Sequence, residues 1–158
     1  MKKLKQKITL LLYNLVLFAV KRIPPDTGTK HLLIIKTDEI GDYILFRNLF
    51  KAIITSSKYK SYQFTIIGNQ AWKSLYDEFD KDLPCNVIWL NKGKFKKNLS
   101  YRFQFLRRIR DLKTSEVINC IFSRSMLWDD ALAFVAGGRK FAMKSGGANF
   151  TVKNMGQN

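Results

Sequence analysis

Short apolar runs alternate with amphipathic segments along most of this 158-residue chain. Such short runs are typical of buried strands, whereas the segments between them repeat apolar residues every three or four positions, as helices do. We predict strands over residues 32–35, 64–67, 87–90 and 117–122, a fifth strand over 140–143, and helices over 42–55, 70–79, 99–112 and 126–135. The alternation predicts an α/β fold, with a parallel, doubly wound sheet, flanking helices and right-handed crossovers.

The charge balance is strongly basic, with 28 Lys and Arg against 12 Asp and Glu and a formal net charge of +16. Such an excess favours a polyanionic neighbour, whether nucleic acid, an anionic membrane surface or a phosphorylated substrate. The length and a hydrophobic fraction of 46% indicate one globular domain. Two distant cysteines, Cys85 and Cys120, exclude a disulfide framework, and the lone His31 excludes a metal site built from several histidines.

Residues 1–22 form a separate amphipathic segment. Four lysines lie within the first seven residues, residues 8–20 are largely apolar, and two basic residues and a Pro-Pro pair follow. As a helix the apolar run is about 20 Å long, short of the ~30 Å hydrocarbon core of a bilayer. We predict an amphipathic helix over 1–22 that binds an anionic membrane surface, and a linker over 23–30. A helix packed on its own domain and an uncleaved signal-anchor are the alternatives.

The loop after the first predicted strand, residues 36–42, is the strongest candidate for a site. In an open α/β sheet, ligands bind at the carboxyl ends of the strands. Gly41 lets a substrate approach the backbone closely. Asp42 lies at the positive end of the following helix, where a carboxylate can act as general base toward a bound hydroxyl. The alternative is structural: Asp42 favours the helix start and Asp38 caps it.

Two common nucleotide-binding motifs are absent from the sequence. No Gly-x-Gly-x-x-Gly follows the first strand, and no Gly-x-x-x-x-Gly-Lys-[Ser/Thr] occurs anywhere. The chain therefore has neither a dinucleotide fingerprint nor a P-loop, and no cofactor is predicted.

The sequence IIKTDEIGD, residues 34–42, followed by an apolar helix, resembles the opening of the family 9 glycosyltransferases, the bacterial lipopolysaccharide heptosyltransferases. In that family the aspartate after the glycine is taken as the base that activates the acceptor hydroxyl. The resemblance gives this role to Asp42. The neighbouring motif positions, expected to contact the acceptor, are Lys36, Thr37, Asp38 and Gly41, with Asp38 where a serine is common.

A second resemblance lies at the fourth predicted strand, where the family typically has Val-Ile-Asp-x-Gln-Gly-x-x-[Lys/Arg]-Ser. Residues 117–125 are VINCIFSRS, so that Asn119 replaces the aspartate and the Gln-Gly pair is missing. Arg124 and Ser125 align with the basic residue and the serine after one deletion. The resemblance implies acceptor contacts from both, and an arginine suits a carboxylate or phosphate. The alternative for Arg124 is a solvated loop arginine.

The resemblance spans residues 32–142 and implies the N-terminal half of a two-domain GT-B enzyme. Residues 31–143 would be a Rossmann-like acceptor-binding domain, and residues 144–158 a tail or truncated interdomain segment. The family transfers a heptose-like sugar, by inversion and without a metal ion, from a nucleotide-sugar to a cell-envelope glycolipid of the lipopolysaccharide type. The nucleotide-sugar donor is held mainly by the C-terminal domain, so we expect this chain to be inactive alone and to need a missing domain or a separate chain.

The resemblance also implies a location in the cytoplasm, peripheral to the inner membrane. The alternative function is a non-catalytic, basic, membrane-associated α/β module, or the remnant of a truncated transferase. Either way the expected partner is an anionic membrane surface or a glycolipid, and nucleic acid is not expected.

The largest charge cluster lies between residues 92 and 113, where aromatic side chains are interleaved with basic ones. Its basic members are Lys92, Lys94, Lys96, Lys97, Arg102, Arg107, Arg108, Arg110 and Lys113. We predict that this basic segment faces an anionic membrane or cradles an anionic glycolipid. A nucleic-acid surface, or a surface helix with its arginines in water, would give a similar pattern.

Overall fold

Five parallel strands form one sheet in the part of the chain that the structure, a computed structural model, describes: residues 11, 14, 18, 29–124 and 126–142. The strands are β1 (His31–Lys36), β2 (Gln63–Asn69), β3 (Asn86–Leu90), β4 (Glu116–Asn119) and β5 (Arg139–Ala142), in the order β3-β2-β1-β4-β5. The order reverses at β1, with β2 and β3 on one side and β4 and β5 on the other. This is the order of a Rossmann-like fold, and it confirms the predicted doubly wound sheet.

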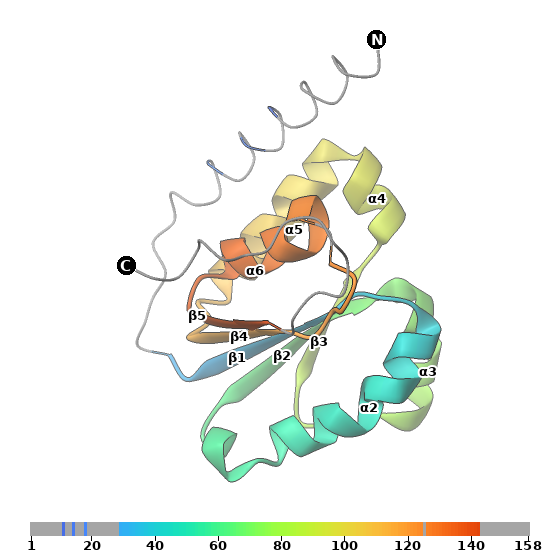
Figure 1. The fold of residues 1–158 in the computed structure, drawn as a ribbon, viewed down its shortest axis with the longest axis vertical. Coiled ribbons are helices and arrows are strands. Elements are labelled where there is room, and N and C mark those ends of the chain that lie inside the picture. Colours follow the sequence, from blue (N-terminus) through green and yellow to red (C-terminus); the bar gives the residue numbers. More distant parts are fainter. Residues whose placement is uncertain (1–10, 12–13, 15–17, 19–28, 125, 143–158) are drawn as a thin grey trace.

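Helices cover both faces of the sheet (Figure 1). On one face lie α2 (Ile40–Ile54) and α3 (Lys73–Phe79), and on the other α4 (Lys92–Lys97), α5 (Leu99–Asp111) and α6 (Ala131–Ala136). A π turn, Met126–Asp130, leads into α6, and short 3₁₀ turns occupy Ser57–Tyr59 and Gln70–Trp72.

The centre of the molecule is β1, whose apolar residues are fully buried. Leu32 and Ile34 belong to the core beneath α2 and α3, whereas Leu33 and Ile35 belong to the core beneath α5 and α6. Successive side chains of a strand point to opposite faces, so a continuous apolar run needs helices on both sides. The unbroken run at residues 32–35 is therefore the sequence signature of this central strand.

The helices and strands predicted between residues 32 and 142 are all present, with shifted ends. α2 begins at Ile40 rather than at residue 42, so Gly41 and Asp42 lie in its first turn. β4 ends at Asn119 rather than at residue 122. The helix α4 was missed because its six residues are too few to show an apolar period.

The predicted helix over 1–22, most of the linker over 23–30 and the tail over 144–158 lie outside the described residues. Within the first of these, Leu11, Asn14 and Phe18 are described, and all three are helical and exposed. Across the described parts of the chain, no helix combines the length and the apolar character needed to cross a bilayer.

Candidate functional site

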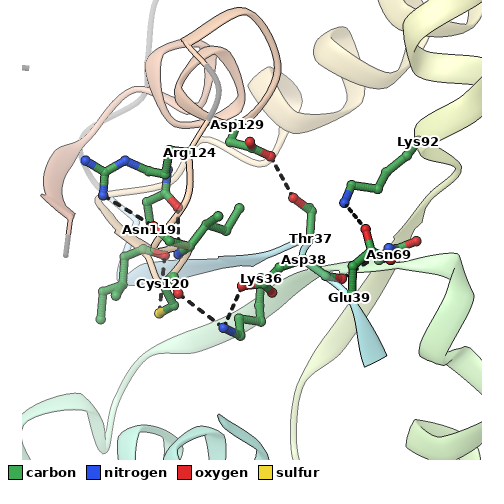
Figure 2. A network of polar contacts seen from close by, with 12 residues as sticks. Lys36, Thr37, Asp38, Glu39, Asn69, Lys92, Asn119, Cys120, Arg124 and Asp129 are labelled. Carbon is green, nitrogen blue, oxygen red and sulfur yellow. Dashed lines mark hydrogen bonds and ion pairs between the residues drawn. The ribbon is translucent and has the colours of Figure 1, made fainter. Parts of the chain in front are cut away.

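Two loops meet where the strand order reverses. β1 and β4 are hydrogen-bonded neighbours, and their register pairs Ile35 with Asn119 at the carboxyl ends. The loop after β1 contains the first motif and the segment after β4 contains the second, so the fold brings both motifs together (Figure 2). In open α/β sheets this switch point is the usual position of a bound ligand.

Lys36, the last residue of β1, is buried although it carries a charge. Its ammonium group donates to Asp38 Oδ2 at 2.8 Å and to the Cys120 carbonyl at 3.3 Å, and it lies 4.7 Å from the centre of the Phe46 ring. Burial raises the pKa of Asp38, the bond and charge of Lys36 oppose this, and the charge of Asp42 adds to it. The Lys36–Asp38 pair thus holds the start of the loop against the ends of β1 and β4.

Two more hydrogen bonds fix the path of this loop. Thr37 is fully buried, and its hydroxyl donates to Asp129 Oδ1 at 2.8 Å, in the π turn before α6. Asn69, at the end of β2, donates from Nδ2 to the Asp38 carbonyl at 3.1 Å, while its Oδ1 accepts from the N–H of Ala71. These bonds tie the loop to the π turn before α6 on one side and to the end of β2 on the other.

The start of α2 shows that Asp38 does not cap this helix. The N-cap residue is Glu39, no side chain caps the helix, and the Asp38 carboxylate is paired with Lys36. The interpretation of Asp38 as the helix cap is therefore wrong. Asp42 lies exposed in the first turn, with no hydrogen bond or ion pair among the described residues. A Cβ built on Gly41 would have no atom within 4 Å, so a ligand has room beside this turn.

The Arg124 residue is partly buried and only 7% of its side chain is exposed, so the alternative of a solvated loop arginine is wrong. Its Nε lies 3.0 Å from Asp130 Oδ1, and its Nη1 donates to the Ile121 carbonyl at 3.4 Å. Burial raises the pKa of Asp130, and the charge of Arg124 opposes this. Arg124 thus braces the segment between β4 and α6, and an anionic ligand would compete with Asp130 for it. Ser125, the other candidate here, lies outside the described residues.

Two buried polar atoms near the switch point have no partner in the described part of the chain. They are Asn119 Nδ2 and Asp38 Oδ1, one a donor and the other an acceptor. The other amide atom of Asn119 is engaged, because Oδ1 accepts from the N–H of Ile121 at 3.2 Å. An unpaired buried polar group costs free energy, so these atoms are candidate contacts for a ligand or an ordered water.

A polar hollow of about 500 Å³ lies beside the loop, at the carboxyl ends of β2 and β3. Its lining residues are Glu39, Asn69, Gln70, Ala71, Asn91, Lys92, Gly93 and Lys96. Lys92 donates to Glu39 Oε1 at 2.7 Å, and Asn91 donates to Gln70 at 3.0 Å. Amides and lysines can hydrogen-bond hydroxyls and anions. Lys92 and Lys96 were expected here only as members of the basic segment, and the sequence shows no sign of the other lining residues outside the loop, although Asn69 and Asn91 follow two predicted strands.

The basic segment is not one continuous cationic surface, because Arg102 and Arg110 are buried. Arg102 donates to the Phe95 and Lys96 carbonyls, each at 2.8 Å, and Arg110 donates to the Val135 carbonyl at 3.1 Å. These two arginines hold α4 and α6 against α5. The exposed cations of the segment are Lys94, Lys96, Lys97, Arg107, Arg108 and Lys113.

Comparison with known proteins adds no assignment: no protein-family model, curated protein or solved structure matches the chain. Among the described residues, no group of three or more His, Cys, Asp or Glu side chains could hold a metal ion. A functional hypothesis therefore depends on the switch-point geometry and on the two sequence motifs.

Proposed function

We propose that this chain is the acceptor-binding domain of a glycosyltransferase of the family 9 type. The enzyme would transfer a heptose-like sugar from a nucleotide-sugar to a cell-envelope glycolipid, at the cytoplasmic side of the inner membrane. A second domain or a separate chain would bind the donor. The observation that supports this most is the meeting of the two motif loops at the switch point, with an exposed carboxylate in the first turn of α2.

In the proposed reaction Asp42 is the general base. The acceptor hydroxyl lies beside the first turn of α2, where Gly41 leaves room. Its oxygen attacks the anomeric carbon, its proton passes to the Asp42 carboxylate, and the bond from the anomeric carbon to the nucleoside diphosphate breaks. The free N–H groups at the start of α2 stabilise negative charge at this position.

Asp38 and Glu39 are the competing carboxylates in the loop, and Glu39, although exposed, is bound to Lys92. Asp38 is more strongly held. One of its oxygens is bound to Lys36 and the other is buried, so a substrate hydroxyl could reach it only after the pair had moved. Asp42 needs no such movement. The contacts therefore favour Asp38 as the residue that positions the loop and Asp42 as the base.

Amide NMR tests acceptor binding by this chain. An inner-core acceptor saccharide should shift the resonances of residues 36–42 and 119–124, and should leave those at the amino ends of the strands unchanged. Absence of shifts in both loops, with the fold intact, would refute acceptor binding.

Transfer tests the base. With a nucleotide-sugar and a donor-binding domain supplied in trans, Asp42→Asn should slow transfer by about 10²-fold or more, the range of general-base catalysis. Asp77→Asn is the matched control, because Asp77 is a half-exposed carboxylate on α3. Transfer by Asp42→Asn at the rate of this control would refute the role of Asp42.

The alternative, a non-catalytic membrane-associated module, is favoured by the pairing of polar groups with one another. Lys36 is bound to Asp38, Thr37 to Asp129, and Arg124 lies against Asp130. Such pairs stabilise a loop even where no ligand binds. Under this alternative the chain binds anionic vesicles, but the saccharide shifts no resonance in either loop.

A further inference from the structure

α2 has two apolar sides, and only one of them is packed. The buried side consists of Tyr43, Phe46, Phe50 and Ile54. On the opposite side, four aliphatic side chains are exposed: Ile40 by 43%, Ile44 by 54%, Leu45 by 85% and Leu49 by 46%. Ile40 and Ile44 form one row of side chains and Leu45 and Leu49 an adjacent row, and the two rows together cover the half of the helix that faces away from the buried side. We refer to this half as the outer α2 face.

This arrangement is unusual for a helix on the surface of a domain. A surface helix normally presents charged and polar residues to water, and a helix that is apolar all around is covered. The other exposed residues of α2 are Gly41, Asp42, Asn48, Lys51 and Ala52. Arg47, between the two ends, is partly exposed but is paired with Asp80, so the unpaired charges of the helix lie at its two ends. Contiguous exposed apolar side chains mark a contact with a protein or a membrane.

We propose that the outer α2 face docks on the surface of an anionic lipid bilayer. Interfaces between proteins are enriched in aromatic and arginine side chains that fill matched pockets. The outer α2 face has only isoleucine and leucine, on a single convex helix. A fluid bilayer accepts such a ridge without a matched pocket, because the aliphatic side chains enter the boundary between headgroups and acyl chains.

The charge at the carboxyl end of α2 supports the same partner. Lys51 is exposed in the last turn, and Lys60, also exposed, follows it. Lys58 is exposed as well, but its ammonium group is bound to Glu116 and to the Tyr59 hydroxyl. Lysine side chains extend along apolar surfaces and place their ammonium groups among lipid phosphates. The net charge of +16 adds a long-range attraction to an anionic surface.

This surface is distinct from the two membrane contacts that the sequence predicted. It lies on the opposite face of the sheet from the basic segment on α4 and α5 (Figure 1). It also goes beyond the proposed transferase function, because it depends only on the exposed side of α2. Failure of saccharide binding would leave it standing, and failure of bilayer docking would leave the saccharide test unaffected.

A fluorophore at position 45 gives a site-specific readout in the full chain, whatever other segments also bind lipid. Leu45→Cys is labelled in a Cys85→Ser background, where the remaining Cys120 is buried. Leu99→Cys is the comparison, because Leu99 is 42% exposed on α5, within the basic segment. Since α5 lies on the opposite face of the sheet from α2, a bilayer in contact with the outer α2 face does not reach position 99 (Figure 1). Brominated vesicles rich in phosphatidylglycerol should quench the label at position 45 far more than the label at position 99. Equal quenching, or none at position 45, would overturn the proposal.

Charge substitutions provide an independent test. Leu45→Glu should weaken partitioning into these vesicles by about tenfold or more, because one leucine no longer enters the bilayer. Leu99→Glu has the same net charge and should have little effect. Lys51→Glu should weaken binding to anionic vesicles only. Equal effects of Leu45→Glu and Leu99→Glu would overturn the proposal, as would a dimer that Leu45→Glu dissociates without any lipid quenching at position 45.

Discussion

Replacing Gly41 with alanine should stabilise the fold, whereas the same change at two other glycines should destabilise it. Gly41 is helical, and a Cβ there meets no atom within 4 Å. Alanine is favoured over glycine in helices by about 0.5–1 kcal/mol, mainly because glycine loses more backbone entropy on folding. In a domain of this size that corresponds to a rise of about 1–4 °C in Tm.

Gly68 and Gly138 are the matched comparisons. A Cβ on Gly68 would lie 2.4 Å from Cη2 of Trp72, a fully buried side chain stacked on Tyr43. Gly138 has a φ of +65°, and a Cβ there would lie 2.6 Å from the carbonyl oxygens of Thr114 and Ser115. Crowding in a packed core and strain at a positive φ each cost about 1–3 kcal/mol, so alanine at either position should lower stability.

Urea denaturation of the three variants at neutral pH checks these signs. A lower midpoint for Gly41→Ala would refute the open space beside the first turn of α2, and an unchanged midpoint for Gly68→Ala would refute the packing of Trp72. The saccharide titration separates stability from function. If the acceptor passes over Gly41, the alanine variant should bind it more weakly although the fold is more stable.

Two buried titratable groups should make stability depend on pH. Burial lowers the pKa of His31 below 6.5, although a backbone hydrogen bond opposes this. The contribution of His31 to the free energy of unfolding is therefore full above pH 6.5 and is lost as the pH falls through 6.5 toward the folded pKa. NMR titration of this lone histidine measures the shift directly. Burial alone would raise the pKa of Glu116, but hydrogen bonds from Arg139 and Tyr59 and the charges of Lys58 and Arg139 lower it below 4.5. The stability that Glu116 contributes is thus present above pH 4.5 and lost below it. Glu116→Gln should lower the free energy of unfolding by about 1–3 kcal/mol at pH 7, and the urea midpoint of this variant should depend less on pH in the acid range.

The sheet could be predicted because the inner strands β1 and β2 contain short, mostly apolar runs, residues 32–35 and 64–67, that are bounded on both sides by polar residues or glycine. The ends of the elements depend on tertiary contacts. Lys36 belongs to β1 because Asp38 and the Cys120 carbonyl neutralise and bind its ammonium group. β5 has exposed side chains throughout, so its sequence pattern is weak. Local sequence contains none of these long-range pairings.

The position of the candidate site was predictable from the order strand, polar loop, helix, but its internal contacts were not. Thr37 and Asp129 are 92 residues apart in the sequence and are joined by a hydrogen bond. The burial of Arg124 likewise depends on Asp130, at the end of the π turn. The polar side chains of this loop thus form a mostly paired network. Glu39 and Asp42 are both exposed, but Glu39 is paired with Lys92, which leaves Asp42 as the exposed carboxylate of the loop without a partner among the described residues.

α2 links the two proposals, because it presents Asp42 in its first turn and the outer α2 face along its length. A helix with side chains is about 10–12 Å across, so one lying on a bilayer would hold Asp42 at about the depth of the headgroups. A glycolipid acceptor could then present its sugar to Asp42 without leaving the membrane. We therefore expect Leu45→Glu to slow transfer to a glycolipid in vesicles and to leave transfer to the free headgroup saccharide unchanged. An equal loss with both acceptors would show that position 45 affects the site itself, and would refute this coupling between docking and transfer.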